Sequence, residues 1–111
     1  MKKINIIKKN EDYNRIIKNC KSYKYKDFVA YMEWVDSSIY HFGFSVGKKI
    51  GNAVTRNRVK RQLKSILDKI TFKNNFNCII IVRKGILDKT FQQMQDELNE
   101  LVELIKIKKE N

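Results

Sequence analysis

The feature that most constrains this fold is an amphipathic segment in the middle of the chain. We predict a helix that begins after Asn52, a residue type that caps helices well, and ends near Ile70. Apolar side chains recur along it at the spacing of one helix face: Val59, Leu63, Ile66, Leu67 and Ile70. Such a face needs an apolar surface to cover, so the rest of the chain must supply a sheet or other helices.

The opposite face of this helix is basic. At about 100° per residue it collects Asn57, Lys60, Arg61 and Lys64, with Arg58 on its flank. Residues 48–64 carry seven basic side chains and no acid, and no acid occurs anywhere between Asp36 and Asp68. Solvated helix faces usually mix both signs of charge, and arginine is well shaped to bind phosphate. We therefore interpret residues 48–64 as an RNA-binding surface.

The composition agrees with a polyanion as partner. The 111 residues suffice for one domain, residues 1–111, with one core. Lysine and arginine number 24 against 12 acids, which gives a formal net charge of +12. A generally lysine-rich proteome would explain the scattered lysines, but not the long stretch without an acid.

Two strands are predicted before the helix. Residues 28–35, FVAYMEWV, are β-formers on both faces, and the strand could begin as early as Tyr25. Residues 39–46, IYHFGFSV, place Phe42, Phe44 and Val46 on one face. Residues 36–38 provide a turn, so we expect an antiparallel hairpin. His41 has no evident partner and is interpreted as an ordinary strand residue. Gly47 and Gly51 bracket the loop that follows.

The two ends of the chain are predicted to be helical. Residues 1–9 form a basic extended or frayed lead, and Asn10 can cap a short helix in which Ile16 and Cys20 belong to the core. Tyr13 and Ile17 lie one turn apart and could be core residues or line a groove. Near the other end, a buried strand at residues 78–82 precedes a helix capped by Asp88 or Thr90. Its apolar stripe is Phe91, Met94, Leu98, Leu101, Val102 and Ile105.

The predicted architecture is an α/β domain of order α-β-β-α-β-α, with a sheet packed by helices. Residues 21–26 are interpreted as a polar break between elements. The last helix is acidic on its outer face, so we exclude it from the RNA surface. A weaker signal for RNA is an aromatic platform formed by Tyr13, Phe28 and Tyr31, because unpaired bases stack on such rings.

No arrangement of residues suggests catalysis. We found no nucleophile–histidine–acid set, no paired carboxylates in a polar motif and no phosphate-binding GxxxxGK[ST] loop. Cys20 and Cys78 lack metal-ligand spacing and are expected to be free thiols in a reducing cytosol. No apolar run is long enough to cross a membrane and no signal peptide is evident, so we expect a cytoplasmic protein.

Residues 48–61, KKIGNAVTRNRVKR, resemble the signature KKxGNAVxRNRxKR of the protein subunit of bacterial ribonuclease P, and every fixed position is met. Shorter resemblances support it along nearly the whole chain. They are KNEDY at residues 9–13, FVAY at 28–31, GFSVGKKIG at 43–51 and CIIIVRKG at 78–85.

This resemblance implies a fold with an uncommon left-handed β-α-β crossover and a role beside a catalytic RNA. That RNA would cleave the 5′ leader from precursor tRNA with Mg²⁺ held mainly by the RNA, with no catalytic residue in this chain and one protein per RNA. The residues implied in binding the catalytic RNA are Lys49, Asn52, Arg56, Asn57, Arg58, Lys60, Arg61 and Lys64. Those implied in binding the single-stranded leader are Tyr13, Ile17, Phe28, Tyr31 and Lys48.

One position departs from the family pattern. Where a second aromatic is common one turn after Tyr13, this chain has Ile17, which packs against a base but does not stack as a ring does.

Two other functions remain open on the residues alone. A ribosomal or RNA-chaperone protein would explain the charge equally well, though not the long signature. A protein-only nuclease would need metal ligands that the sequence does not offer.

Overall fold

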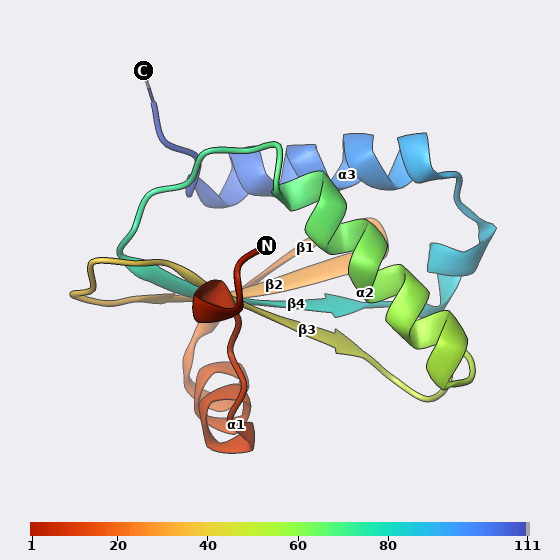
Figure 1. The fold of residues 1–111 in the computed structure, drawn as a ribbon, viewed down its shortest axis with the longest axis horizontal. Coiled ribbons are helices and arrows are strands. Elements are labelled where there is room, and N and C mark those ends of the chain that lie inside the picture. The colour runs from red at the N-terminus through yellow and green to blue at the C-terminus, as the bar shows by residue number, and fades with distance from the viewer. Residues whose placement is uncertain (111) are drawn as a thin grey trace.

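The computed structural model describes residues 1–110 as one sheet with helices on both faces. Helices α2 (Ala53–Leu67) and α3 (Phe91–Ile105) cover one face, and α1 (Asn10–Asn19) lies against the other (Figure 1). Two short 3-10 turns, η1 (Lys3–Asn5) and η2 (Lys84–Asp88), complete the helical elements. None of the helices in residues 1–110 is both long and apolar enough to span a membrane.

The sheet has four strands in the order β1-β2-β4-β3. They are β1 (Lys21–Tyr25), β2 (Phe28–Trp34), β3 (His41–Val46) and β4 (Phe76–Val82). β2 pairs antiparallel with both β1 and β4, while β3 pairs parallel with β4. The α/β class is therefore confirmed, with the order α-β-β-β-α-β-α, one strand more than the sequence predicted.

Two sequence predictions about the strands are wrong. Residues 21–26 are not a polar break, because Tyr23 and Tyr25 of β1 alternate with exposed side chains and pack against the core as an edge strand does. The expected hairpin of β2 and β3 does not form, because β4 lies between them. Cys78, Ile79 and Ile80 of β4 are buried on both faces, which only a central strand allows.

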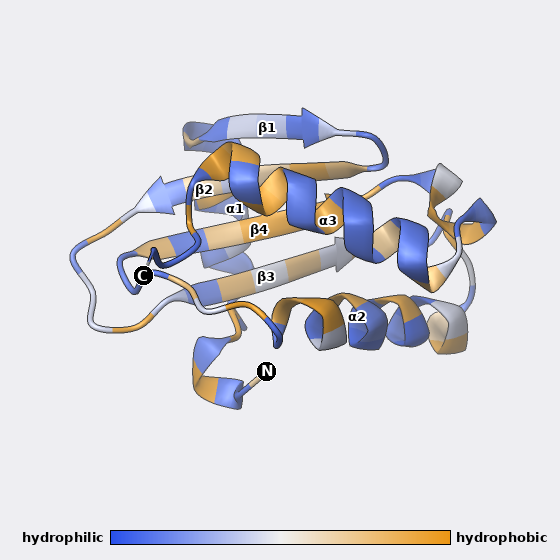
Figure 2. Cartoon of the chain, turned by 90° about the horizontal axis from the view of Figure 1, so that it is seen from above, coloured by the Kyte–Doolittle hydropathy of each residue, from blue (hydrophilic) through white to orange (hydrophobic). Residues whose placement is uncertain are grey.

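The connection from β3 through α2 to β4 is a left-handed crossover. Figure 2 views the sheet from the side of α2 and α3, with β3 running from left to right and β4 above it. The chain returns through α2 in front of the sheet and then passes to the strand on the left of β3, as seen along its direction. This arrangement is the rare hand for a parallel crossover, and it agrees with the expectation from the resemblance.

The main core lies between the sheet and the two covering helices. Val59, Leu63, Ile66 and Leu67 of α2 are buried as predicted, although the helix ends at Leu67 and the half-buried Ile70 follows it in a turn. The cap of α3 is Thr90, whose hydroxyl accepts from the Gln93 N–H while the Gln93 side chain accepts from the Thr90 N–H.

A second, smaller apolar cluster lies under α1. It contains the buried Ile7, Ile16 and Ile79, with five half-buried side chains around them: Tyr13, Ile17, Cys20, Tyr31 and Ile81. In Figure 1, α1 lies below the ends where β3 and β4 begin, and no helix of residues 1–110 covers the same face near the ends where these strands finish. The α1 face of the sheet is therefore only partly covered.

Candidate nucleic-acid interface

The basic surface begins at the loop before α2. The buried Ile50 anchors this loop, and its N–H donates to the Gly47 carbonyl at 3.0 Å. Asn52 caps the helix as predicted, since its side chain accepts from the Thr55 N–H at 2.9 Å. A Cβ on Gly51 would lie 2.9 Å from a Thr55 side-chain carbon, so the loop closes tightly onto the first helical turn. Lys48 and Lys49 remain exposed.

The polar face of α2 presents its cations without partners. Asn57, Arg58 and Arg61 are exposed, whereas Arg56, Lys60 and Lys64 are half-buried along the helix flanks. Within residues 1–110, the ion pairs are all made by other cations. The buried Nε of Arg56 has no hydrogen-bond partner among these residues. The helix thus presents a surface of uncompensated positive charge, which favours a polyanion.

Tyr13 is fixed against the outer edge of β3. Its hydroxyl accepts from the Phe44 N–H at 3.1 Å and donates to the Ile7 carbonyl at 3.3 Å. Burial raises the pKa of this phenol, and the bond from Phe44 opposes that rise only in part. A Cβ on Gly43 would lie 2.9 Å from the ring, so only glycine lets the ring lie so close to the strand.

A groove joins α1, β3 and α2. Its volume is about 460 Å³, and its lining consists of Asn10, Tyr13, Asn14 and Ile17 of α1, residues 44–46 of β3 and Lys60 of α2. Tyr31 and Ile81 pack in the same apolar cluster as Tyr13 and Ile17, so the uncovered face of the sheet continues from the groove. An apolar wall with one cation beside it suits the bases and phosphates of a single strand.

The structure brings together some of the predicted leader-binding residues and separates others. Tyr13 and Ile17 line the groove, and Tyr31 is in contact with the same cluster. The placement of Phe28 in this groove is wrong, because its side chain is 0% exposed and lies in the core between the sheet and the covering helices. Lys48 is exposed in the loop two residues beyond β3 and does not line the groove.

The alternation of a strand could have excluded Phe28 from this site, because positions 28 and 31 are three apart and must lie on opposite faces. Sequence reasoning also missed residues that do line the site. The side chains of Asn10 and Asn14 share one helix face with Ile17, a spacing that was visible in the sequence. The position of Lys60 beside α1 was not visible, because it depends on the crossover.

A chain of polar contacts holds α1 on the sheet. The Arg15 guanidinium donates to both carboxylate oxygens of Glu33 on β2, at 3.1 and 2.9 Å, and also to Asp12 at 2.6 Å. The bonds from Arg15 lower the pKa of the Glu33 carboxyl. Glu33 accepts in turn from Asn77, whose amide oxygen is 2.9 Å from His41 Nδ1. His41 thus has a partner that the sequence did not reveal.

Comparisons with known proteins agree with this arrangement of helix and groove. A family model described as ribonuclease P matches residues 1–106. The chain belongs to the ribonuclease P protein family. Members of this family help the RNA of ribonuclease P to process tRNA precursors, so this chain is the protein component of a ribonucleoprotein endoribonuclease that acts in 5′ maturation of tRNA.

Individual relatives cover almost the whole chain. The ribonuclease P protein component of Mesoplasma florum is 40% identical over 105 residues, which span 92% of this chain and 96% of the relative. The corresponding protein of Mycoplasma mobile is 40% identical over 111 residues, 99% of this chain and 97% of the relative. The solved structure of the Staphylococcus aureus RNase P protein superimposes with a TM-score of 0.84 at 33% identity, covering 93% of this chain and 96% of that one.

Proposed function

We propose that this chain binds the two RNAs of the reaction on neighbouring surfaces. The catalytic RNA lies on the basic face of α2 and its loop, and the single-stranded 5′ leader of precursor tRNA lies in the groove beside Tyr13. The observation that carries the proposal is the position of Lys60, which belongs to the basic helix and also lines the groove. The two RNAs would therefore meet at this side chain.

The surface for the catalytic RNA comprises the loop and helix residues implied by the signature: Lys49, Asn52, Arg56, Asn57, Arg58, Lys60, Arg61 and Lys64. The cations among them have no acidic partner in residues 1–110. They can exchange counterions for phosphates without first breaking an ion pair. Each neutralised phosphate contributes about 0.7–0.9 to the slope of log affinity against log salt.

The leader groove holds unpaired nucleotides by packing and stacking. The Tyr13 ring is half-buried and its hydroxyl is engaged, so the remaining ring surface is rigidly placed for a base. Ile17 provides packing without stacking, and Tyr31 extends the surface across the sheet. Lys48 follows the end of β3 and would contact a phosphate where the leader leaves the groove. Stacking contributes about 1–3 kcal/mol per base.

We further propose that the RNA carries out the hydrolysis with Mg²⁺ that it binds itself, with one protein per RNA. Among residues 1–110 no group of three or more histidine, cysteine or acidic side chains could hold a metal ion. The protein would add positive charge where two RNAs repel one another, so its effect should be largest when Mg²⁺ is scarce.

The test is reconstitution with the catalytic RNA from the same source. Cleavage of precursor tRNA at low Mg²⁺ should increase when the protein is added, and a failure to increase would contradict the proposal. Arg58→Ala should weaken binding of the catalytic RNA and reduce the salt slope by about one. Tyr13→Ala should weaken binding of precursor tRNA more than binding of mature tRNA, which lacks the leader. Equal losses of affinity for both variants in both assays would refute the assignment of two separate surfaces.

A further inference from the structure

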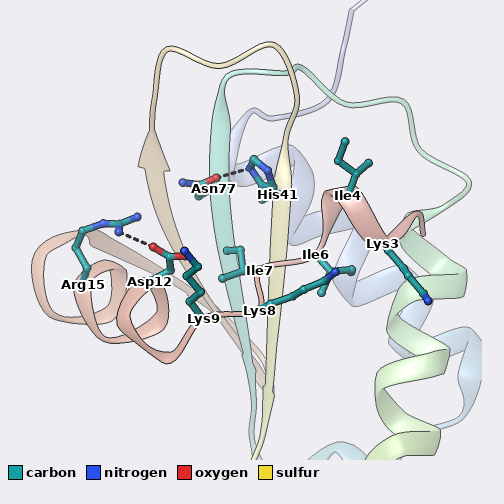
Figure 3. A pocket seen from close by; sticks show the side chains of 10 residues that line it. All are labelled: Lys3, Ile4, Ile6, Ile7, Lys8, Lys9, Asp12, Arg15, His41 and Asn77. Carbon is teal, nitrogen blue, oxygen red and sulfur yellow. Dashed lines mark hydrogen bonds and ion pairs between the residues drawn. The ribbon is translucent and has the colours of Figure 1, made fainter.

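A second pocket lies on the other side of α1 from the groove. Its volume is about 320 Å³, and it is enclosed by the N-terminal segment, the start of α1 and the starts of β3 and β4 (Figure 3). The lining residues are Lys3, Ile4, Ile6, Ile7, Lys8, Lys9, Asp12, Arg15, His41 and Asn77. Neither the signature helix nor any predicted leader contact lines it.

The N-terminal segment that forms one wall is held in place by β3. The Ile7 N–H donates to the Phe42 carbonyl at 2.8 Å, and Ile6 forms a parallel bridge with Phe42. The buried Asn5 donates to the Tyr40 carbonyl at 2.8 Å. These bonds fix the lead that the sequence suggested was extended or frayed. The pocket therefore exists before any ligand binds.

The polar wall of the pocket has a defined hydrogen-bonding pattern. The amide nitrogen of Asn77 donates to the Glu33 carboxylate, so its amide oxygen must face His41. That oxygen can only accept, and His41 therefore carries its proton on Nδ1. In the neutral ring the second nitrogen, Nε2, is then an acceptor. His41 lines the pocket, where its Nε2 can take a hydrogen bond from a ligand.

The rest of the lining combines positive charge with apolar surface. Lys3, Lys8 and Lys9 are exposed and take no part in the ion pairs of residues 1–110. Asp12, the one acid of the lining, is paired with Arg15 at 2.6 Å. Ile4 is 63% exposed at the rim, although it is an apolar residue. Cations beside an exposed apolar wall and a hydrogen-bond acceptor match a phosphate, a base face and a base or ribose donor.

We propose that this pocket is a second RNA site, which binds one nucleotide that does not lie in the groove beside Tyr13. Lys8 and Lys9 hold its phosphate, Ile4 and Ile6 pack against its base, and His41 accepts a hydrogen bond from it. The nucleotide can come from the catalytic RNA or from a far part of the leader. The inference rests on the role in RNA processing but not on the assignment of the groove or of α2.

The test compares two double variants that each remove two exposed lysines. Lys8→Gln with Lys9→Gln alters the pocket. Lys73→Gln with Lys109→Gln is the control, because it removes two exposed lysines that do not line the pocket, where the segment after α2 pairs with the C-terminal segment. The pocket variant should bind RNA about tenfold more weakly and lower the salt slope by about one to two, against less than twofold for the control. Equal losses in the two variants would overturn the proposal.

His41→Phe should weaken RNA binding about fivefold while leaving the salt slope unchanged, because it removes a hydrogen bond and no phosphate contact. A folded His41→Phe protein with full affinity would also contradict the proposal. Binding of the catalytic RNA alone and of precursor tRNAs with short and long leaders identifies the source of the nucleotide. Arg58→Ala, measured in parallel, shows independently whether α2 binds RNA.

Discussion

Gly43 and Tyr13 form a pair whose energetics can be tested directly. A Cβ added at Gly43 would lie 2.9 Å from three atoms of the Tyr13 side chain, closer than real Cβ contacts. The clash would displace the ring and break its bonds to the Phe44 N–H and the Ile7 carbonyl. Overpacking and an unpaired N–H each cost about 1–3 kcal/mol.

Whether Gly43→Ala lowers or raises stability depends on Tyr13. Glycine inside a strand is itself unfavourable by about 0.5–1 kcal/mol relative to alanine, and Gly43 has no positive φ that would require glycine. We therefore expect Gly43→Ala to destabilise the protein by about 2 kcal/mol, a fall in Tm of about 8 °C. In a Tyr13→Ala background the clash is absent, and the same substitution should stabilise by about 0.5 kcal/mol.

Urea denaturation of the four proteins in this cycle measures the coupling. The expected coupling energy between the two sites is about 2–3 kcal/mol, well above the typical error of additivity for distant sites. The Gly43→Ala protein should also lose leader binding, because the ring no longer occupies the groove wall. A cost of Gly43→Ala that is the same in both backgrounds would refute the close contact between the ring and the strand.

Four further substitutions test other parts of the structure. Glu33→Gln should cost about 0.5–1 kcal/mol at neutral pH. The Glu33 carboxyl has a lowered pKa beside Arg15. The cost of the substitution is therefore fully present above the ordinary glutamate pKa and should vanish as the pH falls through the lowered value. A cost that does not change with pH in denaturation experiments would contradict this prediction. Phe28→Leu should cost about 1–2 kcal/mol with unchanged leader affinity. Tyr31→Leu should weaken leader binding at little cost in stability. A leader titration together with a Tm measurement distinguishes the two variants. Thr90→Ala should cost about 1 kcal/mol of stability, measured by calorimetry, without changing RNA affinity. An unchanged stability would contradict a stabilising role of the Thr90 cap.

The parts of the fold that follow local rules were predictable from the sequence. Helix α2 was visible because its apolar period, its cap at Asn52 and its basic face all agree. The buried strand near Cys78 was visible for the same reason, whereas the cap of α3 was narrowed only to Asp88 or Thr90 and the structure shows that it is Thr90. Each of these signals depends on residues within a few positions of one another.

Pairing between distant segments was not predictable in the same way. The hairpin of β2 and β3 was expected because neighbours in sequence usually pair, yet the apolar run of β4 could be buried on both faces only between them. The strand β1 was missed because lysines alternate with its tyrosines. The partner of His41 was invisible because Asn77 lies 36 residues away. The full lining of the leader groove was not predictable for the same reason, because Lys60 lies beside α1 only as a result of the crossover.

The outer edge of β3 connects the fold to the proposed function. An edge strand exposes unpaired backbone groups, and here the N-terminal lead binds the Phe42 carbonyl while the Tyr13 hydroxyl binds the Phe44 N–H. The same hydroxyl bond fixes the ring that forms the groove wall. Tyr13→Phe should therefore lower stability and loosen the ring together, even though it keeps the aromatic face. A loss of leader affinity in that variant would show that placement of the ring, as well as its presence, is required for binding.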